Sequence, residues 1–211
     1  SKIIIFWGNN AKVSSPHQWA LAVKARKNND AVIISIDPRK SQTAESSDVW
    51  IQPQPGSDVA LAYGFAEYLL QNNGVDKKFI DEWTTGFKEY SKEALTWTPN
   101  RVQKVTGISR DKIEKVGNLL LNSNGASAFM IGLGLQKSLQ GAEAARAVSL
   151  LPAILGFHRG FHYSNSSGKT IDWDYINGSS QALKKGKIIN GVGSILDPAL
   201  PRLFYSDLFL I

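Results

Sequence analysis

The segment Val32–Arg39 constrains the fold of this chain more than any other. Four apolar residues, most of them β-branched, lead into Asp37-Pro38-Arg39. A short apolar run bounded by a turn signal predicts a buried strand, and Pro38, which has no N–H for a sheet, ends it by Asp37. Asp37 and Arg39 are then expected at the carboxyl end of a strand, the edge where open α/β sheets bind ligands. An acid and a base there suit ribose hydroxyls and a purine or phosphate, although a plain strand and turn is the simpler interpretation of these residues alone.

The start of the chain predicts a partner for this strand. Residues 3–7 form a strongly apolar, β-branched and aromatic strand, and Gly8, Asn9 and Asn10 follow at once. Gly and Asn tolerate positive φ angles, so backbone N–H groups in such a turn approach a ligand closely. A helix is predicted over 17–27, which completes a strand–helix–strand unit.

The spacing within this unit argues against an ordinary NAD site. Asp37 lies 29 positions beyond Gly8, whereas the acidic residue of the nicotinamide dinucleotide fingerprint follows at roughly 20. The Gly-x-Gly-x-x-Gly turn of that fingerprint is also absent.

A third strand is expected to end near residue 51, before a turn that contains Gly56, Ser57 and Asp58. A helix is predicted over 59–71. Ser57 and Asp58 suit its N-terminus, where side chains cap free N–H groups and where anions bind. Capping is the favoured interpretation from spacing, and the alternative is a carboxylate that accepts the N–H groups of a guanine.

The remaining chain predicts a helical segment and one more strand. The strand is expected over 126–131 and runs into Gly132-Leu133-Gly134. A loop rich in Gly, Ser and Asn is predicted over 156–168, so a domain boundary is placed near residue 160. We therefore expect one domain over 1–160 and the truncated start of a neighbouring domain over 161–211. The further helices are predicted over 76–83, 90–95, 99–105, 109–121 and 140–155.

Composition narrows the function classes. The net charge of +6 favours anionic partners such as nucleic acid, phosphate-bearing cofactors or acidic protein faces. The basic residues are scattered apart from residues 184–187, which is more typical of a solvated surface than of a nucleic-acid footprint. The chain of 211 residues has no cysteine, which excludes disulfides, iron–sulfur ligation and a cysteine nucleophile within it. No apolar run approaches the ~20 residues of a membrane span.

Two motifs imitate functional sites. Residues 163–170 resemble a phosphate-binding loop, but Tyr163 stands where the first glycine belongs and no clear strand precedes it. His158 and His162 have the spacing of a helical metal pair, but Gly160 lies between them and no third ligand is near. His17, near the start of the first helix, is interpreted as a surface residue.

Several short motifs, taken in order over about residues 3–165, resemble the molybdopterin-dependent oxidoreductases of the dimethyl-sulfoxide-reductase and formate-dehydrogenase type. No single motif is specific, and their order carries the resemblance. Ala11 departs from it, because a proline often stands there in the family. The matching motifs are Gly8-Asn9-Asn10, Asp37-Pro38-Arg39, Pro55-Gly56-Ser57-Asp58, Asp76-x-x-Phe79-Ile80, Thr85-Gly86-Phe87, Thr106-Gly107, Gly132-x-Gly134-x-Gln136, and Gly141 with Arg146.

The resemblance implies a Rossmann-like α/β domain, with a mostly parallel sheet flanked by helices, that is the third domain of a large subunit. That subunit holds molybdenum or tungsten between two molybdopterin guanine dinucleotides. This chain would bind the guanine dinucleotide part of one of them. By resemblance, Gly8, Asn9 and Asn10 would lie at the diphosphate and ribose, Asp37, Pro38 and Arg39 at the ribose and guanine, Gly56, Ser57 and Asp58 at the guanine edge, and Gly132, Gly134 and Gln136 toward the pterin.

The resemblance also sets what is not expected here. The metal-ligating residue and any iron–sulfur cysteines lie earlier in the family's chain, so no catalytic residue or metal ligand is predicted and the fragment alone should be inactive. We expect it to be a piece of a longer protein, with the rest of its polypeptide and electron-transfer subunits as partners, and with no nucleic acid and no direct membrane insertion. The compartment stays open, with the cytoplasm favoured and the periplasm an option if a preceding segment carries an export signal.

Two alternatives belong to other function classes. The first is a stand-alone nucleotide-binding regulatory α/β module without a redox metal. The second is a nucleic-acid-binding domain, suggested by the positive charge and six tryptophans.

Overall fold

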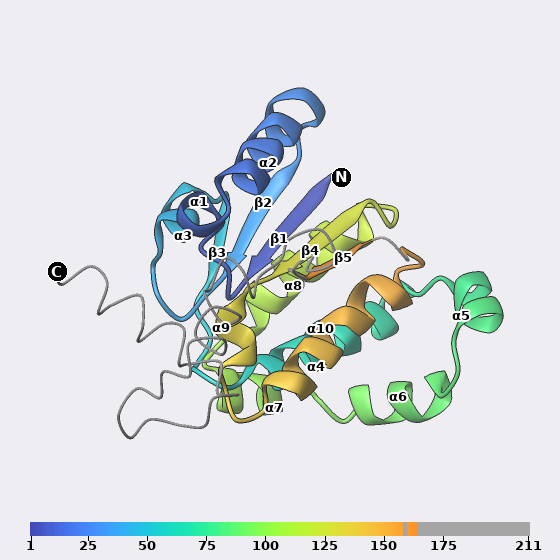
Figure 1. Ribbon diagram of the computed structural model, residues 1–211. Helices are drawn as coiled ribbons and strands as arrows, with labels where there is room; N and C mark the ends of the chain where they lie inside the picture. The colour runs from blue at the N-terminus through green and yellow to red at the C-terminus, as the bar shows by residue number, and fades with distance from the viewer. Residues whose placement is uncertain (158–159, 164–211) are drawn as a thin grey trace, which may run out of the picture. The chain divides into compact units, whose positions relative to one another are not determined.

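A five-stranded parallel sheet organises the part of the chain that the structure describes (Figure 1). The computed structural model describes residues 1–157 and 160–163, and it separates the chain into two compact units, 1–164 and 165–211. The strand order β3-β2-β1-β4-β5 and the parallel pairing of all neighbours confirm the predicted α/β fold. The strands are β1 (Ile3–Trp7), β2 (Val32–Ile36), β3 (Val49–Ile51), β4 (Ser127–Ile131) and β5 (Phe161–Tyr163).

Strand β1 lies at the centre of the sheet, and its register fixes where the neighbouring loops begin. Trp7 is paired with Ile36 of β2 on one side and with Ile131 of β4 on the other. The three strands therefore end in one row. Residues 8, 37 and 132, which follow them directly, start their loops side by side at the carboxyl edge.

The apolar run of β1 is explained by helices on both faces of the sheet. Ile3, Ile5 and Trp7 pack into a large core with the helices α4 (Asp58–Gln71), α8 (Arg110–Leu121) and α10 (Gly141–Ile154). Ile4 and Phe6 pack into a smaller core on the opposite face. All five residues are at most 4% exposed. Because side chains alternate along a strand, a strand that is buried on both faces must be apolar at every position.

Helices α1 (Ala11–Ser14) and α2 (Pro16–Asn29) cover the smaller core, and α3 (Gln42–Ser46) packs against β2 and β3. On the other face, α4 contacts α6, α7, α8 and α10 and is the centre of the helical layer. The remaining helices are α4 (Asp58–Gln71), α5 (Lys77–Trp83), α6 (Phe87–Ala94), α7 (Pro99–Thr106), α8 (Arg110–Leu121), α9 (Leu133–Gln136) and α10 (Gly141–Ile154).

The seven predicted helices are confirmed with shifted ends, and the short helices α1, α3 and α9 were not predicted. The prediction of an uninterrupted loop over 156–168 is wrong, because β5 lies within it. Phe161 pairs with Phe129 of β4, and the Phe129 N–H donates to the Gly160 carbonyl at 2.6 Å. Glycine-rich composition signals a loop locally, but pairing with a distant strand decides the conformation here. Almost all of the predicted neighbouring domain, 161–211, lies outside the described residues.

Candidate functional site

The chain reverses its direction of winding at β1, and this creates a crevice. From β1 the chain continues to β2 on one side, and β4 later joins β1 on the other side. The loops after β1 and β4 consequently lead to opposite sides of the sheet. In open α/β sheets, ligands bind outside the carboxyl ends of the strands at such a switch point.

Two glycines form the floor of this crevice. Gly8 has a φ angle of +57°, which favours glycine, and Gly132 donates its N–H to the Trp7 carbonyl at 2.9 Å. A Cβ atom on Gly132 would overlap the Gly8 carbonyl oxygen and would lie 2.7 Å from the Asn9 Cα. The backbones of the two loops are therefore in direct contact, and only glycine fits between them at position 132.

Two adjoining cavities open above these glycines. One of about 400 Å³ lies between the loops that follow the strands, and a second of about 290 Å³ lies toward α2 and β4. They share Gly8, Asn10 and Gly134 as lining residues. Of the predicted site residues, these cavities bring together Gly8, Asn9, Asn10, Asp37, Pro38, Arg39, Gly56, Asp58, Gly132 and Gly134.

Ser57 is a predicted site residue that does not line either cavity. Ser57 is 6% exposed, and its hydroxyl donates to the Gln54 carbonyl at 2.6 Å. Gln136 is the last residue of α9. Ser57 occupies the N-cap position of α4 without making a side-chain capping bond, so the favoured interpretation of Ser57 as a capping side chain is wrong.

Asp58 lines the larger of the two cavities, and its carboxylate is bonded within the protein. Its Oδ1 accepts the Trp7 indole N–H at 2.7 Å. Burial raises the pKa of the Asp58 carboxyl, the Trp7 hydrogen bond opposes that rise, and the negative charge of Asp37 adds to it. The two carboxylates therefore influence each other across the larger cavity.

The predicted acid and base after β2 are arranged by a tight turn. The Asp37 Oδ1 accepts the backbone N–H of Arg39 at 2.8 Å, so the carboxylate closes the turn over Pro38. This is the local hydrogen bond that makes Asp a common turn residue. The Arg39 side chain is exposed at the cavity, where its guanidinium is available to an anion.

Asn10 has a structural task that the sequence did not indicate. Its amide oxygen accepts the N–H and hydroxyl of Thr43 at 3.2 and 3.0 Å, and its amide nitrogen donates to Gln42 at 3.0 Å. The side chain thus ties the first loop to α3. A predicted contact of Asn10 with a diphosphate would rest on its backbone.

Sequence reasoning missed three residues at this edge. Lys137 and Ser138 line the larger of the two cavities, where Lys137 is a second cation in addition to Arg39. Lys137 follows the Gly132–Gln136 motif directly, which is the signal that could have identified it. Trp7 was assigned only to a strand, although its position immediately before Gly8 places its polar N–H close to the site.

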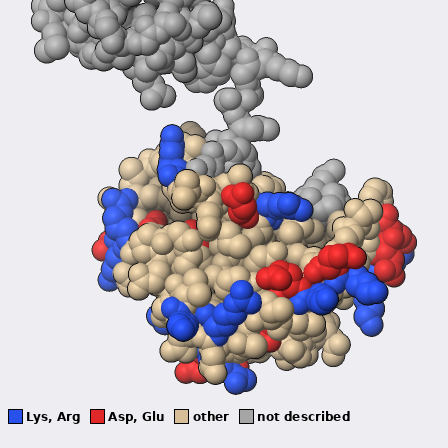
Figure 2. Space-filling model, turned by 90° about the horizontal axis from the view of Figure 1, so that it is seen from below, with Lys and Arg blue, Asp and Glu red and all other residues tan. Residues whose placement is uncertain are grey.

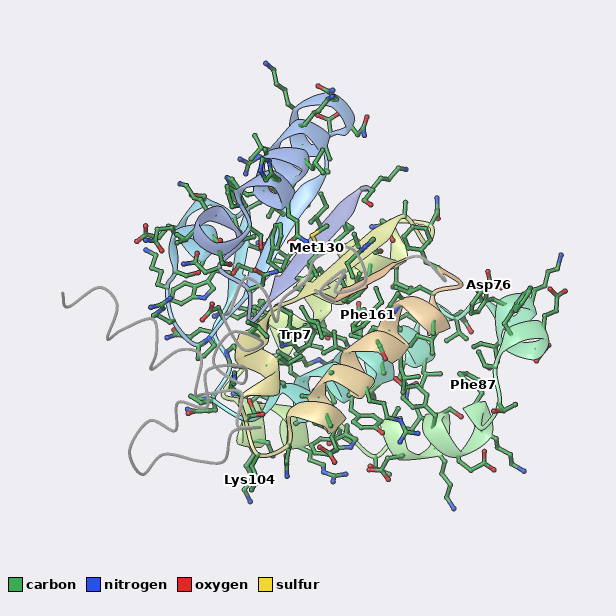
Figure 3. The ribbon with its side chains drawn as sticks, in the orientation of Figure 1. Trp7, Asp76, Phe87, Lys104, Met130 and Phe161 are labelled. Atoms are coloured by element: carbon green, nitrogen blue, oxygen red, sulfur yellow. The ribbon has the colours of Figure 1, made fainter. Side chains whose placement is uncertain are left out.

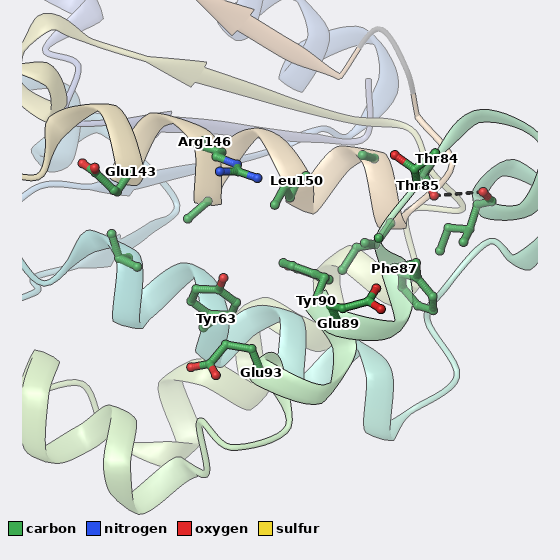
Figure 4. Close-up of a pocket in the computed structure, with 16 residues that line it drawn as sticks. Tyr63, Thr84, Thr85, Phe87, Glu89, Tyr90, Glu93, Glu143, Arg146 and Leu150 are labelled. Carbon is green, nitrogen blue, oxygen red and sulfur yellow. Dashed lines mark hydrogen bonds between the residues drawn. The ribbon is translucent and has the colours of Figure 1, made fainter.

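A third cavity, of about 670 Å³, lies away from the carboxyl edge, between α4, α6 and α10 (Figure 4). Tyr63, Tyr90 and Arg146 project toward it from these three helices. Burial and the nearby Tyr63 raise the pKa of Tyr90. None of the predicted site residues lines this cavity, so the polar groups of the carboxyl edge and the apolar space of the helical layer are separate features.

The described surface carries mixed charge. On the face seen in Figure 2, acidic and basic side chains are interspersed. Within residues 1–157 and 160–163, no three acidic or histidine side chains converge as a metal site would require, and no helix has the length and hydropathy to cross a membrane. His17 is exposed at the start of α2, in agreement with its interpretation. His158, most of the loop 163–170 and the basic run 184–187 lie outside the described part of the chain.

Comparison with known proteins decides the family. Residues 1–194 match the family described as Molybdopterin oxidoreductase. The chain belongs to the molybdopterin oxidoreductase family. Its relatives include the "Probable oxidoreductase YoaE" of Bacillus subtilis, which is 32% identical over 97% of this chain and 31% of its own length.

Two further proteins are similar to this chain, and the name of the first is one of the two enzyme types that the sequence resembles. "Formate dehydrogenase H" of Escherichia coli is 31% identical over 73% of this chain and 21% of its own length. The structure of "Acetylene Hydratase from Pelobacter acetylenicus" superposes with a TM-score of 0.64 at 27% identity, covering 76% of this chain and 22% of the hydratase. The chain thus spans less than a third of the length of these family members.

Proposed function

We propose that this chain is the third, Rossmann-like domain of a molybdenum or tungsten oxidoreductase and binds the guanine dinucleotide part of one molybdopterin guanine dinucleotide. The observation that carries the proposal is the larger cavity at the switch point, where Asp37 and Asp58 face the same space as Arg39 and Lys137. Carboxylates accept the N–H groups of guanine and the hydroxyls of ribose, whereas guanidinium and ammonium groups bind phosphates.

The residues present fit this ligand. The floor of the crevice is formed by Gly8 and Gly132, which have no side chains, so a diphosphate would have access to the backbone there. The two cavities adjoin each other and extend from the acidic residues to Gly132. An elongated ligand with a base at one end and a pterin at the other suits this shape better than a compact one.

The cofactor and the residues of this chain would have different roles in the full-length enzyme. The metal and its pterin ligands would supply the redox reaction, with electron pairs moved by oxygen-atom or hydride transfer. This chain's own residues would bind and orient the nucleotide: Arg39 and Lys137 by charge, Asp37 and Asp58 by accepting hydrogen bonds. The metal ligand and any iron–sulfur cluster would belong to other parts of the polypeptide, so we expect the isolated fragment to be inactive.

The test uses the full-length protein, purified from its natural host and assayed for molybdenum, tungsten and acid-released guanine nucleotide. We expect about one metal and about two guanine nucleotides per polypeptide. Asp37→Ala and Asp58→Ala should each lower the nucleotide content toward about one. Glu143→Ala, which removes the same charge from the separate cavity between α4, α6 and α10, should leave it unchanged.

Two outcomes would refute the proposal. Full nucleotide content in both aspartate variants would show that the site lies elsewhere. A wild-type protein without metal and without nucleotide would favour a stand-alone regulatory module, which keeps the fold for another task.

A further inference from the structure

Trp7 joins the core of the protein to the edge of the larger cavity. It is the last residue of β1 and is completely buried between the sheet and the helices α4 and α10 (Figure 3). Its ring packs edge-on against Phe65 of α4, with 6.0 Å between ring centroids and 83° between ring planes. The packing fixes the direction of the indole N–H, which points to Asp58 in the first turn of α4.

The hydrogen bond between them selects one arrangement of the carboxylate. The Trp7 Nε1 lies 2.7 Å from the Asp58 Oδ1, a short distance of the kind found when the acceptor is ionised. An ionised carboxylate has two oxygens and about four acceptor positions, so further donors can still bind Asp58. Trp7 and Asp58 are 51 positions apart in the sequence, and the bond therefore depends on the packing of α4 under β1.

From this geometry we infer that Trp7 is a positioning residue for the nucleotide site: its indole N–H holds the Asp58 carboxylate in the orientation that accepts the N–H groups of a guanine. The inference rests on the proposed function, because it names how one of the proposed ligand-binding residues is prepared. Trp7 itself, being completely buried, does not contact the ligand.

The charged groups around Asp58 set the sign of the pH dependence. Asp37 on the loop after β2 disfavours its ionisation, as does burial, whereas the Trp7 bond favours it. Arg39 and Lys137 line the same cavity from the loop after β2 and from the end of α9. Removal of the indole N–H takes away a group that stabilises the charged form, so the pKa of Asp58 should rise further. Guanine binding should then be lost at a higher pH as the solution is acidified.

The experiment measures GDP binding to the full-length protein, prepared from cells that cannot make molybdopterin, between about pH 5 and 8. Trp7→Phe keeps an aromatic ring against Phe65 and removes the N–H. We expect the pH midpoint for loss of GDP binding to rise by about one unit, and the affinity in the acid limb to fall about tenfold. Titration of the GDP phosphate affects wild type and variants equally, so it cancels when their pH midpoints are compared.

Trp50→Phe is the matched control. The Trp50 indole N–H also bonds at the end of a strand, but its acceptor is the backbone carbonyl of Asp37, at 2.9 Å. This variant should leave the pH midpoint where it is in the wild type. An equal shift in both variants would mean that loss of any indole at this edge perturbs the site, and it would overturn the specific role of Trp7.

The outcomes separate this inference from the proposed function. A wild-type protein that binds no GDP at any pH would contradict the proposed function itself. GDP binding in which Trp7→Phe and wild type share one midpoint would contradict the role of Trp7 alone. If Trp7→Phe does not fold, Asp58→Asn with Trp7 intact takes its place, because it removes the carboxyl group that titrates. The loss of GDP binding on acidification should then no longer show the wild-type midpoint, and an unchanged midpoint would overturn the inference.

Discussion

Replacement of Gly132 by alanine tests whether contact between two loops builds the site. Gly132 has φ and ψ angles of −103° and 171°, an extended conformation that alanine adopts without strain. Its difficulty is purely steric, because the added Cβ would lie 2.7 Å from the Asn9 Cα and still closer to the Gly8 carbonyl oxygen. Carbon atoms normally pack at about 3.5–4.0 Å, so the loops would have to separate by about 1 Å.

The magnitude follows from what must move. Both obstructing atoms belong to the backbone, so no side chain can rotate away, and overpacking of this kind costs about 3 kcal/mol, the upper part of the usual range. Separation of the loops would also strain the bond from the Gly132 N–H to the Trp7 carbonyl, at 2.9 Å, which adds about 1 kcal/mol. We expect the free energy of unfolding of Gly132→Ala to be about 4 kcal/mol lower than that of wild type.

Gly56→Ala provides the opposite case at the same edge. Gly56 has a φ angle of +79°, and a Cβ there would meet no atom within 4 Å. Its cost is conformational only, about 1–2 kcal/mol. Urea unfolding of the full chain, followed by tryptophan fluorescence, compares the two: with an m value of about 2 kcal/mol/M, the midpoints should fall by about 2 M and by less than about 1 M. A Gly132→Ala midpoint at or above that of Gly56→Ala would refute the steric argument.

Three further substitutions test how the first loop and β2 are held. Asn10→Ala removes the bonds to α3 and should lower the free energy of unfolding by about 1–2 kcal/mol, measured by urea unfolding; no change would mean that α3 is held without it. Asp48→Ala deprives the Ile33 N–H of its 2.8 Å acceptor, which should cost about 1–3 kcal/mol and speed amide exchange at Ile33. Arg26→Ala removes the partly exposed ion pair with Asp48 and a hydrogen bond to the Ser46 carbonyl, but it leaves the Ile33 N–H with its acceptor. Its effect should therefore stay at or below about 1 kcal/mol, and an effect equal to that of Asp48→Ala would contradict the assignment.

The sequence predicted the central strands because their signal is local. A parallel strand covered on both faces needs apolar residues at every position, and residues 3–7 meet that condition without reference to the rest of the chain. The helices of the cover were recognisable for the same reason, since glycines separate them. Strand β5 was not predicted, because the three residues beside Gly160 have too little local preference for a strand. Their extended conformation depends on pairing with β4.

The residues of the site also differ in whether a local signal in the sequence locates them. The turn residues Asp37 and Arg39 could be placed at the carboxyl edge, because a strand end and a proline locate them. The bond from Trp7 to Asp58 spans 51 positions and that from Asn10 to Thr43 spans 33. No pattern within either segment encodes these contacts, because they depend on how the helices pack onto the sheet.

The charges of the larger cavity specify the orientation of a ligand more than they attract it. Asp37 and Asp58 are balanced by Arg39 and Lys137, so the four side chains sum to no net charge. A ligand gains little from overall attraction, yet it gains much when its anionic part lies by the cations and its hydrogen-bond donors lie by the carboxylates. A reversed ligand would place phosphate against two half-buried acids, where like-charge repulsion is less screened than at the open surface. The guanine dinucleotide of the proposed function, with donors at the base and negative charge at the diphosphate, would have the asymmetry that such a cavity can distinguish.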